Sequence, residues 1–319
     1  MDELTTWISG ADGSRLFVRQ WKPEGKPRGV VHIIHGMAEH SLRYGELARR
    51  LRGGGFEVWA ADMRGHGKTA DLGVNGPEAG GLLGHCADRD GFSLVVSDIE
   101  EIHRRIDEAR PGLPLFLLGH SWGSFIAQAY IERYRRPLGG CILSGTRGPD
   151  GIKVVVSVPV MKTLAFFRGV RSRSLFARAL ADGAFNKSFR PNRTNFDWLS
   201  RDEQVVDAFV ADPLCGKLCS VGFYRDLTEA LSRIHKPKAM EGIPRDLPIY
   251  VFSGSADPVG DMGSSPTTLV NVYRSMGITD LEFVLYPDAR HESLNETNRE
   301  EVMENLLGWL SRHCSPQAT

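Results

Sequence analysis

The chain has 319 residues, of which 41% are apolar and 24% charged, with 39 basic and 39 acidic side chains. These proportions are ordinary for a soluble globular protein, and the balanced charge leaves no basic surplus for binding nucleic acid. Five scattered cysteines, an odd number, argue against a disulfide framework and fit a reducing compartment, so we expect a cytoplasmic protein. The most apolar run, residues 154–161, is too short to span a bilayer, and the acidic start of the chain does not resemble a signal peptide.

The first part of the chain predicts strands that alternate with helices. The alternation of apolar residues, the glycine turns and the helical periodicity mark these elements. In order, they are an antiparallel hairpin over 5–22 with its turn at Asp12-Gly13, a strand over 30–34, a helix over 44–51, a strand over 56–61, a glycine-rich loop over 68–92 and a helix over 97–110. Such an alternation is typical of a mainly parallel sheet that is covered by helices.

The most informative stretch is a strand, a tight turn and a helix around residue 121. Residues 115–118 form an apolar run that predicts a strand buried on both faces, and residues 119–123 read GHSWG. Apolar residues then recur at helical spacing from Trp122 towards Pro137. A serine in this context occupies a strained elbow that presents its hydroxyl to a cleft, while the flanking glycines allow close packing. We therefore predict that Ser121 is a nucleophile.

The second part of the chain predicts an insertion into the sheet. A strand over 140–145 is followed by helical fragments without strands over 147–235, a segment with eight of the fifteen phenylalanines. The alternation then resumes with a strand over 248–252, a helix over 265–277, a strand over 281–286 and a final helix that carries Val302, Leu306, Leu307 and Leu310. We predict an α/β fold with an inserted helical cap, divided into a first core part over 1–146, the cap over 147–235 and a second core part over 236–319.

Two late residues complete a catalytic set with Ser121. A serine hydroxyl needs a base, and the base needs an orienting acid. In α/β-hydrolases the chain order is serine, acid, histidine, and here Asp257 follows one late strand while His291 follows the next. Both would emerge at the carboxyl edge of the sheet, on the side of Ser121. Rivals for these two roles are His35, His40, Asp261, Asp280 and Asp288.

An oxyanion hole requires two backbone N–H groups. One is expected from Trp122, directly after the nucleophile. The other is expected from Met37, in the loop that follows the strand over 30–34. Because the backbone does this work, the side chain at position 37 is expected to matter little.

Five motifs together resemble the monoacylglycerol lipase and lysophospholipase branch of the α/β-hydrolases. They are residues 35–40 (HGMAEH), 62–67 (DMRGHG), 119–123 (GHSWG), 254–258 (GSADP) and 290–292 (RHE). The likeness covers most of residues 10–145 and 240–312, while the cap matches in its place and in residues 212–216 (DPLCG). Two residues depart from the animal pattern, since Trp122 is bulkier than usual and Ser124 replaces a second glycine.

The resemblance implies hydrolysis of a monoacyl lipid ester by a cofactor-free triad, with the cap forming an acyl tunnel. We therefore expect a serine ester hydrolase that acts on a small-molecule ester and holds no metal. The same branch contains short-chain esterases and peptidases, which remain alternatives with the same triad. A ligand receptor without turnover is a third alternative, although a receptor has no need of a general base.

Other residues carry weaker expectations. Glu39 and His40 either shape the substrate entrance or brace their loop, and Asp62, Arg64 and His66 are expected to hold the turn after their strand. Cys215 and Cys219 stand four apart without a second ligand pair, which does not predict a zinc site.

The cap has two further features. Its phenylalanines either line a lipid pocket or form the core of the cap; those concerned are Phe166, Phe167, Phe176, Phe185 and Phe189. The cap also holds more basic than acidic residues, which either contact an anionic membrane surface or form a solvated face.

Overall fold

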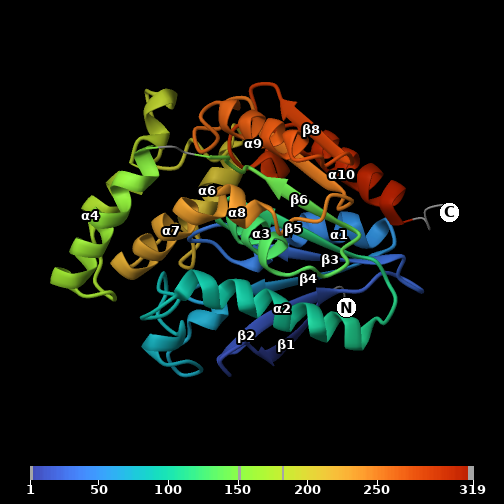
Figure 1. The fold of residues 1–319 in the computed structure, drawn as a ribbon, viewed down its shortest axis with the longest axis horizontal. Helices are drawn as coiled ribbons and strands as arrows, with labels where there is room; N and C mark the ends of the chain where they lie inside the picture. Colours follow the sequence, from blue (N-terminus) through green and yellow to red (C-terminus); the bar gives the residue numbers. More distant parts are fainter. Residues whose placement is uncertain (1–2, 150–151, 182, 315–319) are drawn as a thin grey trace.

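The structure, a computed structural model, describes residues 3–149, 152–181 and 183–314. The outer ends of the two predicted core parts, residues 1–2 and 315–319, lie outside this range. An eight-stranded sheet runs through the molecule (Figure 1). Across the sheet the order is β1 (Leu4–Ser9), β2 (Arg15–Trp21), β4 (Phe56–Asp62), β3 (Gly29–Ile34), β5 (Leu115–His120), β6 (Gly140–Ser144), β7 (Ile249–Gly254) and β8 (Leu281–Tyr286).

The sheet is parallel from β4 to β8, and β1 and β2 add an antiparallel edge. The predicted fold class, strands and hairpin are confirmed. Strand β3 lies between β4 and β5 in the sheet. The chain therefore passes from β3 to β4 on one side and then crosses to β5 on the other side, which reverses the direction in which strands are added. This is the switch point at which a crevice opens at the carboxyl ends of the strands.

Helices cover both faces of the sheet, because alternate strand residues point to opposite sides and most residues of the central strands β3 to β7 are apolar and buried. One face packs against α1 (Gly45–Gly53) and α10 (Arg299–Cys314). The other face packs against α2 (Gly91–Ala109), α3 (Trp122–Arg133), α8 (Pro237–Met240) and α9 (Ser264–Ser275). Short 3₁₀ turns occupy the loops, namely η1 (Ser41–Tyr44), η2 (Gly67–Ala70), η3 (Pro77–Ala79) and η5 (Ser293–Asn295).

Two predicted helix boundaries are wrong. Helix α2 begins at Gly91 rather than near residue 97, and its first N–H is capped by the Asp226 carboxylate, 135 residues away. No local residue signals this start, since Asp90 makes no side-chain cap. Helix α3 ends at Arg133, four residues before Pro137, and the backbone is already extended at Tyr134.

The segment between β6 and α8 contains helices without strands, in agreement with the predicted pattern. They are α4 (Ile152–Arg168), α5 (Leu175–Ala181), η4 (Phe185–Phe189), α6 (Glu203–Ala211) and α7 (Val221–Ile234). We call residues 147–235 the cap, and these boundaries remain a prediction. Figure 1 shows α4 and α7 side by side at the end of the molecule that lies beyond the sheet. Within the described residues, no helix combines the length and apolarity needed to cross a bilayer.

Candidate active site

Ser121 occupies the sharp turn between β5 and α3. Its backbone has φ 54° and ψ −121°, a strained conformation for a residue with a side chain. A Cβ at Gly119 would lie 2.3 Å from the Gly123 carbonyl oxygen, and a Cβ at Gly123 would lie 2.2 Å from that of Ile34. The two glycines of the motif are therefore required for the strand, the turn and the helix to pack this closely. The predicted elbow geometry is confirmed.

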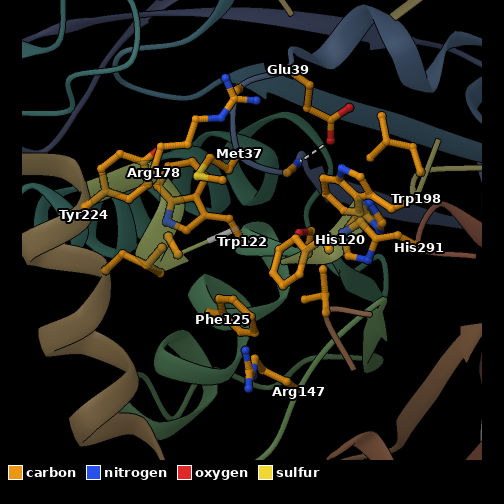
Figure 2. A pocket seen from close by; sticks show the side chains of 18 of the residues that line it. Met37, Glu39, His120, Trp122, Phe125, Arg147, Arg178, Trp198, Tyr224 and His291 are labelled. Carbon is orange, nitrogen blue, oxygen red and sulfur yellow. Dashed lines mark hydrogen bonds between the residues drawn. The ribbon is translucent and has the colours of Figure 1, made fainter. Parts of the chain in front are cut away.

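Ser121 opens into a cavity of about 320 Å³ between the sheet edge and the cap. Met37, Trp122 and His291 line the same cavity, so these predicted residues meet in one place. Figure 2 shows His291 with His120 and Trp198 on one side of this cavity, and Met37 with Trp122 on the other. Most of the wall is apolar, and the cap contributes Met161, Phe185, Phe196, Tyr224, Leu227 and Leu231.

His291 and Asp257 form a buried pair next to this cavity. His291 Nδ1 lies 2.9 Å from Asp257 Oδ2, and the two residues are 2% and 0% exposed. Asp257 also accepts hydrogen bonds from the Val259 N–H and the Ser253 hydroxyl. Among the described residues, no hydrogen bond joins the Ser121 hydroxyl to the His291 ring. The structure therefore joins the predicted acid and the predicted base directly, and it brings the predicted nucleophile to the same cavity.

The charges of this pair follow from its burial. Burial alone would lower the pKa of His291, but the charge and hydrogen bond of Asp257 raise it above its usual value. Burial alone would raise the pKa of Asp257, but His291 keeps it below its usual value. The carboxylate is thus ionised at neutral pH and stabilises a proton on the ring.

The loop after β3 packs directly on the elbow. A Cβ at Gly36 would lie 3.3 Å from the Ser121 Cβ and 3.4 Å from the His120 ring, so this backbone approaches the serine closely. Met37 follows in the same loop, and Trp122 begins α3. The two predicted oxyanion donors therefore belong to segments in contact beside Ser121. Helix α3 also directs its N-terminal N–H groups to this point, which favours negative charge there.

The sequence reasoning missed Trp198, and it named Ser124 without giving it a structural role. Trp198, in the cap, packs on His291 with ring centroids 5.1 Å apart, and its carbonyl oxygen accepts a hydrogen bond from the backbone N–H of His291 at 3.3 Å. Ser124 donates to the Ser121 carbonyl oxygen at 2.6 Å and contacts the Thr146 hydroxyl at 2.7 Å. The serine that replaces the usual glycine therefore braces the elbow. No local pattern signals Trp198, because it lies 93 residues before the histidine that it covers.

The residues of weaker expectation mostly brace loops. Asp62 accepts hydrogen bonds from the Ser41 and Lys68 backbone, and Arg64 is buried in contact with Asp98. His66 Nδ1 lies 2.8 Å from the Arg64 carbonyl oxygen, so the predicted role of these residues in holding the turn is confirmed.

The phenylalanine expectation is wrong for three of its five residues. Phe185 lines the cavity, and Phe189 lies under the Arg290 guanidinium. In contrast, Phe166, Phe167 and Phe176 are 83%, 76% and 57% exposed, so they line neither a pocket nor a cap core. These three side chains lie on the surface of the cap and are exposed to solvent.

All five cysteines are free thiols, and one of them lies in a group of potential metal ligands. Among the described residues, ligand atoms of His40, Asp212 and Cys215 lie within 4.8 Å of one another. Burial raises the pKa of the Cys215 thiol, and His40 Nε2 already lies 2.9 Å from Asp212 Oδ2. The contact between His40 and Asp212 joins the loop after β3 to the cap, so these two side chains brace that loop.

A family model described as serine aminopeptidase, S33, matches residues 25–298 of this chain. The chain belongs to the S33 hydrolase family. This S33 hydrolase is 31% identical to the monoglyceride lipase of Homo sapiens, with 98% of this chain and 92% of that protein covered. It is 29% identical to the monoacylglycerol lipase of Mycolicibacterium smegmatis, with 96% of each chain covered.

Solved structures confirm the fold of this S33 hydrolase. A carboxyl esterase from Bacillus coagulans in complex with glycerol matches with a TM-score of 0.89 and 27% identity, covering 99% of this chain and 100% of that chain. The predicted resemblance to monoacylglycerol lipases is confirmed.

Proposed function

We propose that this chain hydrolyses monoacyl lipid esters of the monoacylglycerol or lysophospholipid type, with Ser121, Asp257 and His291 as its catalytic triad. The observation that carries the proposal is a strained serine that opens into the same largely apolar cavity as a buried Asp–His pair. Membership of a serine hydrolase family and the lipase relatives support the same conclusion.

In the proposed reaction, His291 accepts the proton of Ser121 as the hydroxyl attacks the ester carbonyl. Asp257 holds the ring in the productive tautomer and stabilises its charged form. The Met37 and Trp122 N–H groups stabilise the oxyanion, each by about 3 kcal/mol. His291 then gives its proton to the departing alcohol. In the second half, water attacks the acyl-enzyme while His291 takes its proton, and His291 returns that proton to Ser121 as the acid leaves.

The charges of the cavity favour an ester over a peptide with a free amino terminus. An aminopeptidase needs a carboxylate that is available to bind the substrate ammonium group. The two carboxylates among the described lining residues, Glu39 and Glu292, are both paired with Arg43. The cations Arg147, Arg178 and Lys217 also line the cavity, and Arg147 forms a salt bridge with Asp261.

We also propose that the cap touches a membrane surface while the enzyme works. Exposed apolar side chains gather on α4 and α5, where they are in water at a cost of about 25 cal/mol for each Å². They are Val156, Val160, Phe166, Phe167, Leu175, Phe176 and Leu180. A lipid substrate would leave a bilayer at such a surface, which is consistent with a protein that sits at the membrane periphery.

A substrate panel tests this proposal. The panel contains 1-monoacylglycerols of increasing chain length, a lysophospholipid, p-nitrophenyl acetate and an aminoacyl p-nitroanilide. We expect turnover of the monoacyl lipids to exceed that of the acetate in kcat/KM, with no release from the anilide. A preference for the acetate would favour a small-ester esterase, and anilide cleavage would favour a peptidase. Binding of these molecules without turnover would favour a receptor.

A further inference from the structure

Arg43 joins two loops that come from distant parts of the chain. Its Nη1 and Nη2 each donate to the Glu292 carboxylate at 2.7 Å, and Nη1 also contacts Glu39 Oε2. Glu39 stands two residues after Met37, and Glu292 directly follows His291. One cation therefore links the loop of the proposed oxyanion donor to the loop of the proposed base.

Glu39 in turn shapes the first of these loops. Its Oε1 accepts hydrogen bonds from the Gly36 N–H and the Tyr44 hydroxyl, the latter at 2.8 Å. A Cβ at Gly36 would lie 2.8 Å from that oxygen, and Ala38 has φ 57°. The backbone around Met37 is thus wrapped tightly about one carboxylate. If that carboxylate moves, the N–H at position 37 moves with it.

The ion cluster of Arg43, Glu39 and Glu292 is shielded from water. Glu39 and Glu292 are each 3% exposed, and the Arg43 side chain is 12% exposed. The ring of Phe209, in the cap, packs on the guanidinium with 4.8 Å between the ring centre and the guanidinium carbon. In such surroundings the removal of one partner leaves an uncompensated buried charge, so the three groups hold one another in place.

We propose that Arg43 is a positioning residue for the hydrolysis: by holding Glu39 and Glu292 in one cluster, it fixes the oxyanion loop against the loop of His291. The inference rests on the proposed function, since it takes Met37 and His291 as working parts of the site. A guanidinium suits this task because its planar fork binds a carboxylate through two parallel hydrogen bonds. Catalysis depends on such alignment, and a displacement of 1 Å can cost about a hundredfold in rate.

The cluster also sets the charge that faces His291. Asp257, Glu292 and Glu39 all act to raise the pKa of that ring. On the other side stands His120, with ring centroids 4.8 Å apart; burial lowers the pKa of His120 to about 4, so it is neutral at neutral pH.

The groups that face Arg43 from the cap add little to this balance. Cys215 stays protonated because burial raises its pKa, and Asp212 is paired with His40. One cation and two carboxylates therefore leave the cluster with a net charge of −1. Any change in this charge is expected to displace the pH at which His291 loses its proton.

The test is the pH dependence of kcat and KM for a soluble ester in four proteins, namely the wild type, Arg43→Met, Glu292→Gln and the double variant. Activity falls at acid pH because a protonated His291 cannot act as a base, and we call this part of the pH profile the acid limb. Arg43→Met brings the charge of the cluster to −2 in the pH range where both carboxylates stay ionised, and in that range the acid limb moves up by about half to one pH unit. Glu292→Gln gives a charge of 0, so the limb moves down. The double variant restores −1, and its limb returns to the wild-type position.

The position of the loops is read from kcat at the pH plateau. We expect Arg43→Met to lower kcat by roughly ten- to a hundredfold, with KM changed less than about threefold, because the loops lose alignment while the apolar walls stay intact. Arg43→Lys keeps the charge but not the fork. It is expected to keep the wild-type acid limb and to recover only part of kcat.

Arg110→Met is the matched control. Arg110 forms an ion pair with Glu57, which is 1% exposed. Glu57 lies near the start of β4, at the amino ends of the parallel strands and so at the far end from the site. This variant leaves a buried carboxylate without its cation as well, so it is expected to unfold at a lower temperature. Its kcat and acid limb, measured below that temperature, are expected to match the wild type.

Two results overturn the proposal. One is an Arg43→Met variant that is folded and keeps the wild-type kcat and acid limb. The other is an unchanged acid limb in Glu292→Gln, which is decisive even if Arg43→Met does not fold. A folded wild type without ester turnover would instead reject the proposed function, and this inference with it.

Discussion

His291 Nδ1 and Asp257 Oδ2 lie 2.9 Å apart at the carboxyl ends of two neighbouring parallel strands, 34 residues apart in the chain. Because both residues are buried, the carboxylate and the ring determine each other's charge. Asp257 raises the pKa of His291 above its usual value although burial opposes this rise. The charge of the His291 ring therefore depends directly on its contact with Asp257.

Asp257→Asn tests this link. The amide keeps the shape but removes the charge, so burial lowers the pKa of His291 and the ring can adopt the wrong tautomer. We expect kcat to fall by about 10⁴-fold and the acid limb of the remaining activity to move to lower pH. Asp288→Asn, at an exposed rival position, is expected to leave both unchanged. Loss of activity at position 288 instead would show that the acid has been misassigned.

The two glycines of the elbow predict a matched pair of stability changes. In Gly123→Ala the new Cβ would lie 2.2 Å from the Ile34 carbonyl oxygen, which belongs to a strand and cannot yield. We expect a loss of about 3 kcal/mol or more in the free energy of unfolding. In Gly45→Ala, within α1, the Cβ meets nothing within 4 Å, so the helix is expected to gain up to about 1 kcal/mol. Urea unfolding of both variants measures the difference, and equal effects would contradict this account of the elbow.

Buried neutral histidines predict sensitivity to acid. His32 is 0% exposed, and burial lowers its pKa to about 3. In the unfolded chain the same ring has a pKa near 6.5. Between pH 6.5 and pH 3 the unfolded state therefore binds a proton, whereas the ring in the folded state stays neutral. The stability present above pH 6.5 is therefore lost as pH falls from 6.5 towards 3, by about 2 kcal/mol at pH 5.

His32→Gln removes this titration while keeping a polar partner for His103, whose Nε2 lies 3.0 Å from His32 Nδ1. Urea unfolding at pH 7.5 and pH 5 is expected to show a smaller loss of stability in the variant than in the wild type. The difference in loss is expected to be about 2 kcal/mol. An equal loss in both proteins would mean that other groups govern the acid sensitivity.

The exposed phenylalanines of the cap are expected to affect binding to lipid surfaces but not the hydrolysis of a soluble ester. In the double variant Phe166→Ser with Phe167→Ser, association with lipid vesicles is expected to weaken, because the cap loses two large exposed apolar rings. Turnover of monoacylglycerol in vesicles is expected to fall with it, while hydrolysis of soluble p-nitrophenyl acetate stays at the wild-type rate. Sedimentation with vesicles measures the binding. A parallel fall in both activities would place these residues in the site rather than at the membrane.

Most of the sheet could be predicted because its signals are local. The run at 115–118 is buried on both faces, and the glycines around Ser121 are demanded by contacts that every such elbow makes. The start of α2 could not be predicted, since its cap comes from Asp226 in another helix. Tertiary partners of this kind leave no mark on the neighbouring sequence.

The same distinction holds within the site. The order of Ser121, Asp257 and His291 along the chain, and the strands before them, were enough to bring them to one edge of the sheet. The bidentate contact of Arg43 with Glu292 joins residues 249 apart, and no periodicity connects them. The exposure of Phe166 was equally hidden, because an aromatic residue in a helical segment predicts burial by default.

The central claim, that Ser121 is an activated nucleophile, is tested most directly by labelling with a fluorophosphonate probe. We expect the wild type and Ser275→Ala, a change at an exposed serine of α9, to be labelled equally. Folded Ser121→Ala is expected to take no label and to lose turnover by about a million-fold. Labelling or turnover that persists in Ser121→Ala would contradict the claim.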